Sequence, residues 1–230
     1  MKKNTVITTE DILLKLCKSV STVLSTASHS SVSYSAMVQK IQKTSLKPDI
    51  GCFVLFDGGF SGLVVINFSS AAAMELYQRY MLSMGFDKDE LAILHTSDEV
   101  SDVLGELMNQ IVGAFTSQIS KELMISISQN QPKMLSISKQ VVLSVDTNLE
   151  RPQARRVSFA TESNNIFYLE FAMDKTEFIQ IEEFEAHEDV DPDVLIALAA
   201  SQAEREETGS LTRKDVEKED HDDLLNSLGI

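Results

Sequence analysis

The stretch Asp102-Val-Leu-Gly-Glu-Leu-Met-Asn-Gln-Ile-Val-Gly113 lies in a longer run that has the periodicity of an amphipathic helix. Apolar residues recur there at intervals of three and four, the spacing of a single helical face. They are Val100, Val103, Leu104, Leu107, Ile111, Phe115 and Ile119. Thr96, with Glu99 three residues later, predicts a capping box at the start. A helix over about residues 97–120 is therefore predicted, with this face buried in a core.

The opposite side of the predicted helix is polar. At about 100° per residue, four of its residues fall within an arc of roughly 60°. They are Asp102, Glu106, Asn109 and Gly113. A glycine inside a helix costs about 1 kcal/mol relative to alanine, and at Gly113 the missing side chain leaves room for another molecule. An exposed helix face is ordinarily polar, however, so these residues alone also fit a face that is merely solvated.

The spacing of the polar residues continues to a proline. Three residues separate Asp102 from Glu106, and two separate Glu106 from Asn109. Twenty-two more lie between Asn109 and Pro132. This pattern resembles the signature of the CheC/CheX/FliY phosphatases of bacterial chemotaxis. The local text Glu-Leu-Met-Asn-Gln-Ile-Val-Gly is also similar to the family's Glu-hydrophobic-x-Asn-x-Ile-x-Gly.

The resemblance implies a cytoplasmic phosphatase that hydrolyses the aspartyl phosphate of a CheY-like response regulator. The regulator supplies the phosphoaspartate and its bound Mg²⁺, so no cofactor of the chain's own is expected. The resemblance assigns Asn109 to holding the attacking water and Glu106 to docking against the regulator's active-site lysine. Phosphoryl transfer depends mostly on positioning, so one amide, which orients water without ionising, is enough. We expect Asp102 and Gly113 to take part in binding, and Pro132 to be a structural stop.

The number of motifs bears on which member the chain is like. CheC and FliY carry two, whereas the first predicted helix, including Asp11–Val23, has no Glu-x-x-Asn. A single motif makes the chain more similar to CheX, and that resemblance implies a homodimer. The alternative function is a non-catalytic adaptor that binds a receiver domain or a flagellar switch protein through the same helix face. A third interpretation is a structural domain that only keeps the fold.

Acidic residues are concentrated at the C-terminal end of the chain. The net charge of −15 argues against nucleic acid and anionic membranes as partners. Residues 181–230 hold 16 acidic and four basic residues, net −12, which leaves −3 for the rest. This shift predicts a phosphatase-like domain over 1–180 and an acidic tail over 181–230. In the tail, Pro192–Glu207 predicts a helix, and Asp222–Asn226 resembles the CheY-binding peptide of FliM and FliY or is simply solvated.

The remaining periodicities predict the fold class. Helices are expected over 8–27 and from Ser69 or Ser70 to about 84, besides the helix at 97–120. Strands are expected at seven places: 32–38, 51–57, 62–68, 123–129, 133–145, 155–162 and 166–174. Gly58-Gly59 and Asn164-Asn165 mark tight turns between strands. This order predicts an α+β fold, an antiparallel sheet covered by helices, and the resemblance, over roughly residues 8–180, implies the same.

Other residue patterns exclude competing classes of function. Cys17 and Cys52 read as buried small hydrophobes and form no disulfide framework, which fits the cytoplasm. The four histidines are scattered without the spacing of a zinc site. No signal peptide is expected, and no apolar run approaches the roughly 20 residues of a membrane span. Arg155-Arg156 reads as a gatekeeper at a strand edge.

Overall fold

The computed structural model describes residues 6–145, 147–149 and 152–179, all of which belong to one compact unit. The predicted acidic tail, with its short helix and its docking peptide, lies outside these residues. The predicted boundary between residues 180 and 181 also falls outside them, so the division into two domains stays a prediction.

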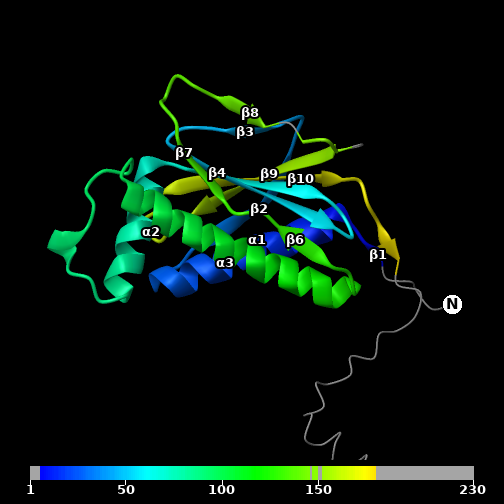
Figure 1. The fold of residues 1–230 in the computed structure, drawn as a ribbon, viewed down its shortest axis with the longest axis horizontal. Coiled ribbons are helices and arrows are strands. Elements are labelled where there is room, and N and C mark those ends of the chain that lie inside the picture. The colour runs from blue at the N-terminus through cyan, green and yellow to red at the C-terminus, as the bar shows by residue number, and fades with distance from the viewer. Residues whose placement is uncertain (1–5, 146, 150–151, 180–230) are drawn as a thin grey trace, which may run out of the picture. The chain divides into compact units, whose positions relative to one another are not determined.

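A seven-stranded antiparallel sheet forms the centre of the described structure (Figure 1). Six strands lie side by side in the order β2 (Ser33–Ile41), β9 (Pro152–Ala160), β10 (Ile166–Asp174), β5 (Gly62–Phe68), β4 (Ile50–Gly58) and β6 (Ile127–Gln129). The seventh, β7 (Lys133–Ser136), also pairs with β4. Because β6 pairs near the end of β4 and β7 near its beginning, the connection between them runs along the β4 edge.

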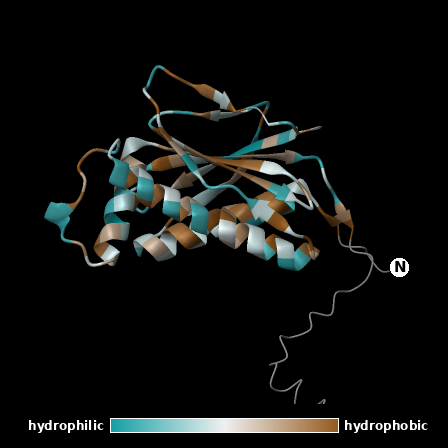
Figure 2. Ribbon diagram, viewed as in Figure 1, coloured by the Kyte–Doolittle hydropathy of each residue, from teal (hydrophilic) through white to brown (hydrophobic). Residues whose placement is uncertain are grey.

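Three helices cover one face of the sheet: α1 (Thr9–Ser28), α2 (Ser70–Ser83) and α3 (Asp98–Leu123) (Figure 1). Each begins at a hydroxyl residue whose side chain accepts a backbone N–H of the first turn, a strong N-cap; these residues are Thr8, Ser69 and Ser97. Figure 2 shows hydrophobic residues along the central strands and both kinds of residue along the amphipathic helices. The core between sheet and helices therefore follows from the predicted helix and strand patterns, and the α+β fold is confirmed.

A small second layer covers the other face of the sheet. It is the two-stranded pair β3 (Thr44–Leu46) and β8 (Leu143–Val145), drawn above the sheet in Figure 1. Glu170 of β10, fully buried, accepts hydrogen bonds from the Ser45 backbone at 2.8 Å, Lys47 at 3.1 Å and Arg156 at 2.9 Å. A buried carboxylate needs such partners, and here they join β3 and β9 to β10. A third pair, β1 (Val6–Ile7) with β11 (Phe178–Ile179), joins the two ends of the described chain.

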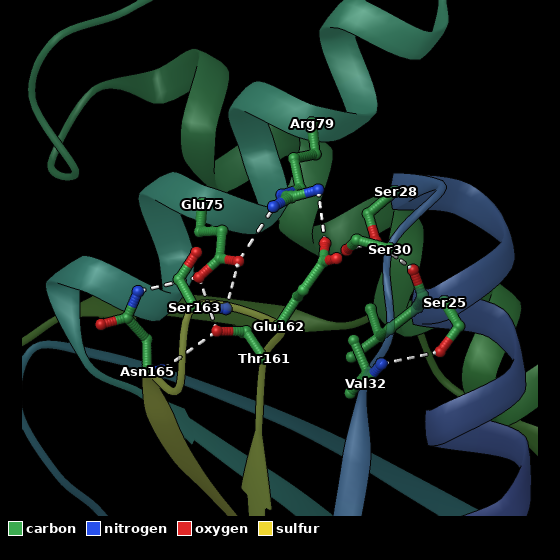
Figure 3. A network of polar contacts seen from close by, with 11 residues as sticks. Ser25, Ser28, Ser30, Val32, Glu75, Arg79, Thr161, Glu162, Ser163 and Asn165 are labelled. Carbon is green, nitrogen blue, oxygen red and sulfur yellow. Dashed lines mark hydrogen bonds and ion pairs between the residues drawn. The ribbon is translucent and has the colours of Figure 1, made fainter.

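A polar network fastens α2 to the hairpin between β9 and β10 (Figure 3). Thr161 and Asn165 donate side-chain hydrogen bonds to the Glu75 carboxylate, and the Ser163 backbone N–H donates another. Arg79 pairs with the same carboxylate at 3.5 Å. Burial acts to raise the pKa of Glu75, but the hydrogen bonds outweigh it and hold the pKa below its usual value. The charged form of Glu75 therefore stabilises the folded state.

Several expectations from the sequence are corrected by the structure. The predicted strand 133–145 is two strands, because a turn closes where the Val141 N–H donates to the Ser138 carbonyl at 3.0 Å. The strand predicted at 123–129 is shorter, since α3 continues to Leu123. The cap of α3 is Ser97 and not Thr96. Glu99, expected to complete a capping box with Thr96, instead accepts a hydrogen bond from the Tyr77 hydroxyl.

The interpretation of Arg155-Arg156 as an edge gatekeeper is wrong. Strand β9 lies between β2 and β10, inside the sheet. The Arg155 side chain is buried and pairs with Glu10 at 2.7 Å, while Arg156 pairs with Glu170 at 2.8 Å. Both arginines therefore hold neighbouring elements together. Cys17 and Cys52, by contrast, are free and buried as predicted.

Candidate functional site

Helix α3 presents the predicted polar residues on its outer side. The structure leaves Asp102 and Glu106 exposed and Asn109 and Gly113 half-buried. The apolar residues of the helix face the core, from Val100 to Ile119, so the helix cannot turn this polar side inward. The orientation predicted from periodicity is confirmed, and the four residues share one surface.

A pocket of about 240 Å³ lies beside this surface. Helix α3, the segment that connects β6 to β7, and β7 itself line it. The lining residues are Ser101, Asp102, Gly105, Glu106, Asn109, Gln131, Pro132 and Met134. The structure thus brings Pro132 to the polar residues of α3, although 22 residues separate it from Asn109. Gly113 does not line the pocket and lies about one helical turn beyond it.

The connection that carries Pro132 is fixed to the sheet. Asn130, two residues before Pro132, donates its backbone N–H to the Leu55 carbonyl at 3.0 Å. The side-chain oxygen of Asn130 accepts a hydrogen bond from the Leu55 N–H at 2.9 Å. These two hydrogen bonds occupy the β4 edge between β6 and β7. Pro132 directly precedes β7, a position where its missing N–H costs no ladder bond. The pocket therefore has one wall on a helix and one on a segment held against the sheet.

The two residues predicted to be catalytic are held differently. Glu106 accepts a hydrogen bond from the Gln110 side chain at 3.1 Å, one turn further along α3. Among the described residues, none forms a hydrogen bond with the Asn109 side chain. The Asn109 amide is therefore available to donate to a water or ligand in the pocket.

The charged side chains that line the pocket are all acidic. Its lining includes two carboxylates, Asp102 and Glu106, and no lysine, arginine or histidine. A phosphate group entering alone would meet negative charge without a compensating cation. The pocket can therefore orient a neutral water or attract a positively charged group, but it needs a partner's cations to hold a phosphate. Within the described residues, no cluster of three or more histidine, cysteine, aspartate or glutamate side chains could hold a metal ion.

Two glycines in α3 are not required by packing inside the chain. A methyl group added at Gly113 would meet nothing within 4 Å. One added at Gly105 would lie 3.6 Å from Met134, an ordinary contact. Both positions nevertheless cost about 1 kcal/mol each relative to alanine in a helix interior. The open surface at both glycines is consistent with the close approach of another molecule.

Some lining residues were not predicted from the sequence. Gln131 was adjacent to the predicted Pro132, and Gly105 was a second mid-helix glycine one turn before Asn109, so both carried a usable signal. Ser101 and Met134 carried none, because only the fold places them at the pocket.

No helix in the described part of the chain combines the length and the apolar character that are needed to cross a membrane.

Comparison with solved structures identifies the class of fold. The chemotaxis protein CheX from Desulfovibrio desulfuricans matches 71% of this chain and 99% of its own, with 18% identity and a TM-score of 0.57. CheX from Vibrio vulnificus matches the same shares with 15% identity and a TM-score of 0.58. The CheX–CheY–BeF₃–Mg²⁺ complex from Borrelia burgdorferi matches 72% of this chain and 99% of the other, with 16% identity and a TM-score of 0.50. The chain therefore has the CheX-like fold.

The family of the chain is shown by a match over nearly its whole length. Residues 3–230 match the family described as "Protein of unknown function (DUF3334)", and the chain belongs to this family. No curated protein matches the sequence. The family match extends to residue 230 and so includes the acidic C-terminal residues.

Proposed function

We propose that this chain is a cytoplasmic phosphatase that hydrolyses the aspartyl phosphate of a CheY-like response regulator in chemotaxis or two-component signalling. The observation that carries the proposal is one pocket, lined by Asp102, Glu106, Asn109 and Pro132, on a CheX-like fold. These are the four positions at which the sequence resembles the CheC/CheX/FliY signature.

The charge of the pocket supports a substrate that brings its own cations. A phosphorylated receiver carries Mg²⁺ and a lysine beside its phosphoaspartate, according to the family resemblance. Glu106 would pair with that lysine, and Gln110 holds the Glu106 carboxylate in place for it. Asp102 adds negative charge one turn earlier on the same surface. Docking would therefore neutralise an acidic surface that has no cation of its own in the pocket lining.

The chemical step would need only one group from this chain. The Asn109 amide donates to the attacking water and keeps it in line with the phosphorus, while the receiver's Mg²⁺ offsets the charge that develops on the phosphoryl oxygens. Asn109 does not take the proton, because an amide does not ionise near neutral pH. Gly113 leaves the surface beyond the pocket open to the receiver backbone.

A homodimer is part of the proposal, as the similarity to CheX implies. Strand β2 lies at the end of the sheet order and carries the exposed apolar residues Met37 and Val38. An edge strand with exposed apolar side chains is suited to pairing with another chain. Light scattering after size-exclusion chromatography tests this: a monomer at all accessible concentrations would contradict it.

The test of the activity is the dephosphorylation rate of purified CheY-like receivers with Mg²⁺. We expect multiple-turnover acceleration by the wild type and a loss of about 100-fold or more in kcat for Asn109→Ala, the usual effect of removing one positioned donor. Gln118→Ala, exposed on the same helix, is the control and should retain the rate. Binding without acceleration, unchanged by Asn109→Ala, would instead indicate the adaptor. Free acetyl phosphate should not be hydrolysed, since the pocket offers it no cation.

A further inference from the structure

A second hollow lies on the other side of the α3 surface. This α1–α2 groove has a volume of about 420 Å³. Its apolar lining is Val23 and Ala27 of α1 with Tyr80 and Met84 at the end of α2, and its polar lining is Thr22, Thr26, His29, Ser83 and Gln110. Its rim includes Gln110, whose side chain holds Glu106. Gly105 and Gln110 lie about 140° apart around α3 at 100° per residue. The polar pocket and the α1–α2 groove therefore flank Glu106 on opposite sides.

The size of a stable protein interface decides whether a partner at Glu106 would reach the groove. A stable interface typically buries about 800 Å² of surface on each partner, which corresponds to a circular patch about 32 Å across. Packed helices lie about 8–10 Å apart, so such a patch centred on Glu106 would extend past α3 onto α1 and the end of α2. A domain docked at the polar pocket would cover the groove as well.

The groove is suited to an apolar group. Val23, Ala27 and Tyr80 are half-buried in its walls, and Met84 is 63% exposed at its mouth. Ser83 donates to the Ala27 carbonyl at 3.1 Å and so fixes the ends of α1 and α2 together. The two helix ends that wall the groove are therefore tied to each other. Burial of apolar surface in it would add affinity that the acidic pocket cannot supply.

We propose that the α1–α2 groove receives an apolar side chain of the same receiver domain whose phosphoaspartate meets Asn109, and that it helps to select that receiver. This inference rests on the proposed function. The acidic C-terminal segment around Asp222 and Asp223 suits the groove less well, because α1 and α2 both end at the groove. Helix C-termini carry partial negative charge and disfavour acidic groups.

Two substitutions at exposed positions test the groove without disturbing the core. Met84→Glu and Thr26→Glu each place a charge in it, and both parent side chains are exposed. Leu82→Glu is the matched control: Leu82 is on the same helix, is 45% exposed and does not line the groove. The measurements are the Kd of the full chain for a receiver carrying beryllofluoride and Mg²⁺, and KM and kcat for the phosphorylated receiver.

We expect the two groove variants to raise Kd and KM about tenfold, equivalent to about 1.4 kcal/mol, with kcat unchanged, while Leu82→Glu behaves as wild type. Unchanged Kd in both variants would overturn the groove proposal. Tighter receiver binding by Met84→Glu would identify the C-terminal segment as the occupant, and a changed oligomeric state would identify a second copy. Either result also overturns the proposal.

The same measurements separate this inference from the proposed function. If the wild type turns over and the groove variants keep their affinity, only the groove proposal fails. If the wild type binds a receiver without turnover, the phosphatase fails, and Kd still tests the groove. If it neither binds nor turns over any receiver, both proposals fail. Asn109→Ala, which should bind but not turn over, provides the reference for loss of chemistry alone.

Discussion

Replacing both helix glycines by alanine should make the protein more stable and less active. Each mid-helix glycine costs about 1 kcal/mol relative to alanine. The methyl group at Gly113 would meet nothing within 4 Å, and that at Gly105 would meet only Met134 at 3.6 Å. The chain itself therefore offers no clash to offset the gain, and the two sites are about 12 Å apart along the helix, far enough for the effects to add. Gly105→Ala with Gly113→Ala should stabilise the fold by about 2 kcal/mol.

The magnitude is large enough to measure by thermal and urea unfolding. For a domain of this size, 1 kcal/mol shifts the Tm by about 2–4 °C, so the double variant should gain about 4–8 °C. Circular dichroism on the full chain gives the stability, and receiver dephosphorylation gives kcat/KM. A methyl group forced into a close interface costs about 1–3 kcal/mol, so kcat/KM should fall at least fivefold. Gln118→Ala should change stability by no more than about 0.5 kcal/mol and leave the activity intact.

Two results would refute different parts of this reasoning. A double variant that is less stable than the wild type would mean that the glycines serve packing inside the chain. A variant that is more stable and fully active would mean that no partner approaches this surface closely. Only the combination of higher stability and lower activity fits a face kept open for a receiver, because selection for stability alone favours alanine at both positions.

Three further predictions follow from other parts of the structure. Glu75→Gln should lower the free energy of unfolding by about 1–3 kcal/mol at pH 7. Because the pKa of Glu75 in the folded state lies below the usual 4.5, the difference from wild type should shrink as the pH falls through and below 4.5. Urea titrations at several pH values measure it. Burial raises the pKa of Cys17 to about 12, so native protein at pH 8 should react slowly with a thiol reagent and urea-unfolded protein quickly; fast native reaction would show an open core. Asn130→Ala should cost about 1 kcal/mol by urea unfolding and lower kcat by loosening the pocket wall; unchanged kcat would separate that wall from catalysis.

The helices and the central hairpin could be predicted because their signals are local. Thr8 and Ser69 cap α1 and α2, and the turn at Gly58-Gly59 separates two strands that pair in register. The second layer could not be predicted, since nothing near Thr44–Leu46 shows that it pairs with Leu143–Val145. No glycine or proline marks the turn after Ser138, so the chain reads there as one continuous strand.

The candidate site likewise has one part that could be predicted from the sequence and one part that could not. The α3 face could be predicted from periodicity alone, whereas Pro132 was expected only as a structural stop and not as part of a pocket wall. The pocket wall formed by the segment between β6 and β7 depends on a non-local contact, the two hydrogen bonds between Asn130 and Leu55. No sequence pattern predicts this contact. The hydrogen bond between Gln110 and Glu106 could have been predicted, because residues four apart on a helix are neighbours.

The acidic pocket makes binding and catalysis separable by a single group. Docking would draw on Glu106, Asp102 and the apolar groove, whereas the proposed chemistry draws on the Asn109 amide and on cations that the receiver brings. A chain that kept the first set and lost the amide would bind the same receivers with the same selectivity and would leave their phosphate in place. Affinity therefore cannot distinguish a phosphatase from an adaptor on this fold. Turnover can, and the comparison of wild type with Asn109→Ala isolates it, because the substitution removes a donor that no other described residue engages.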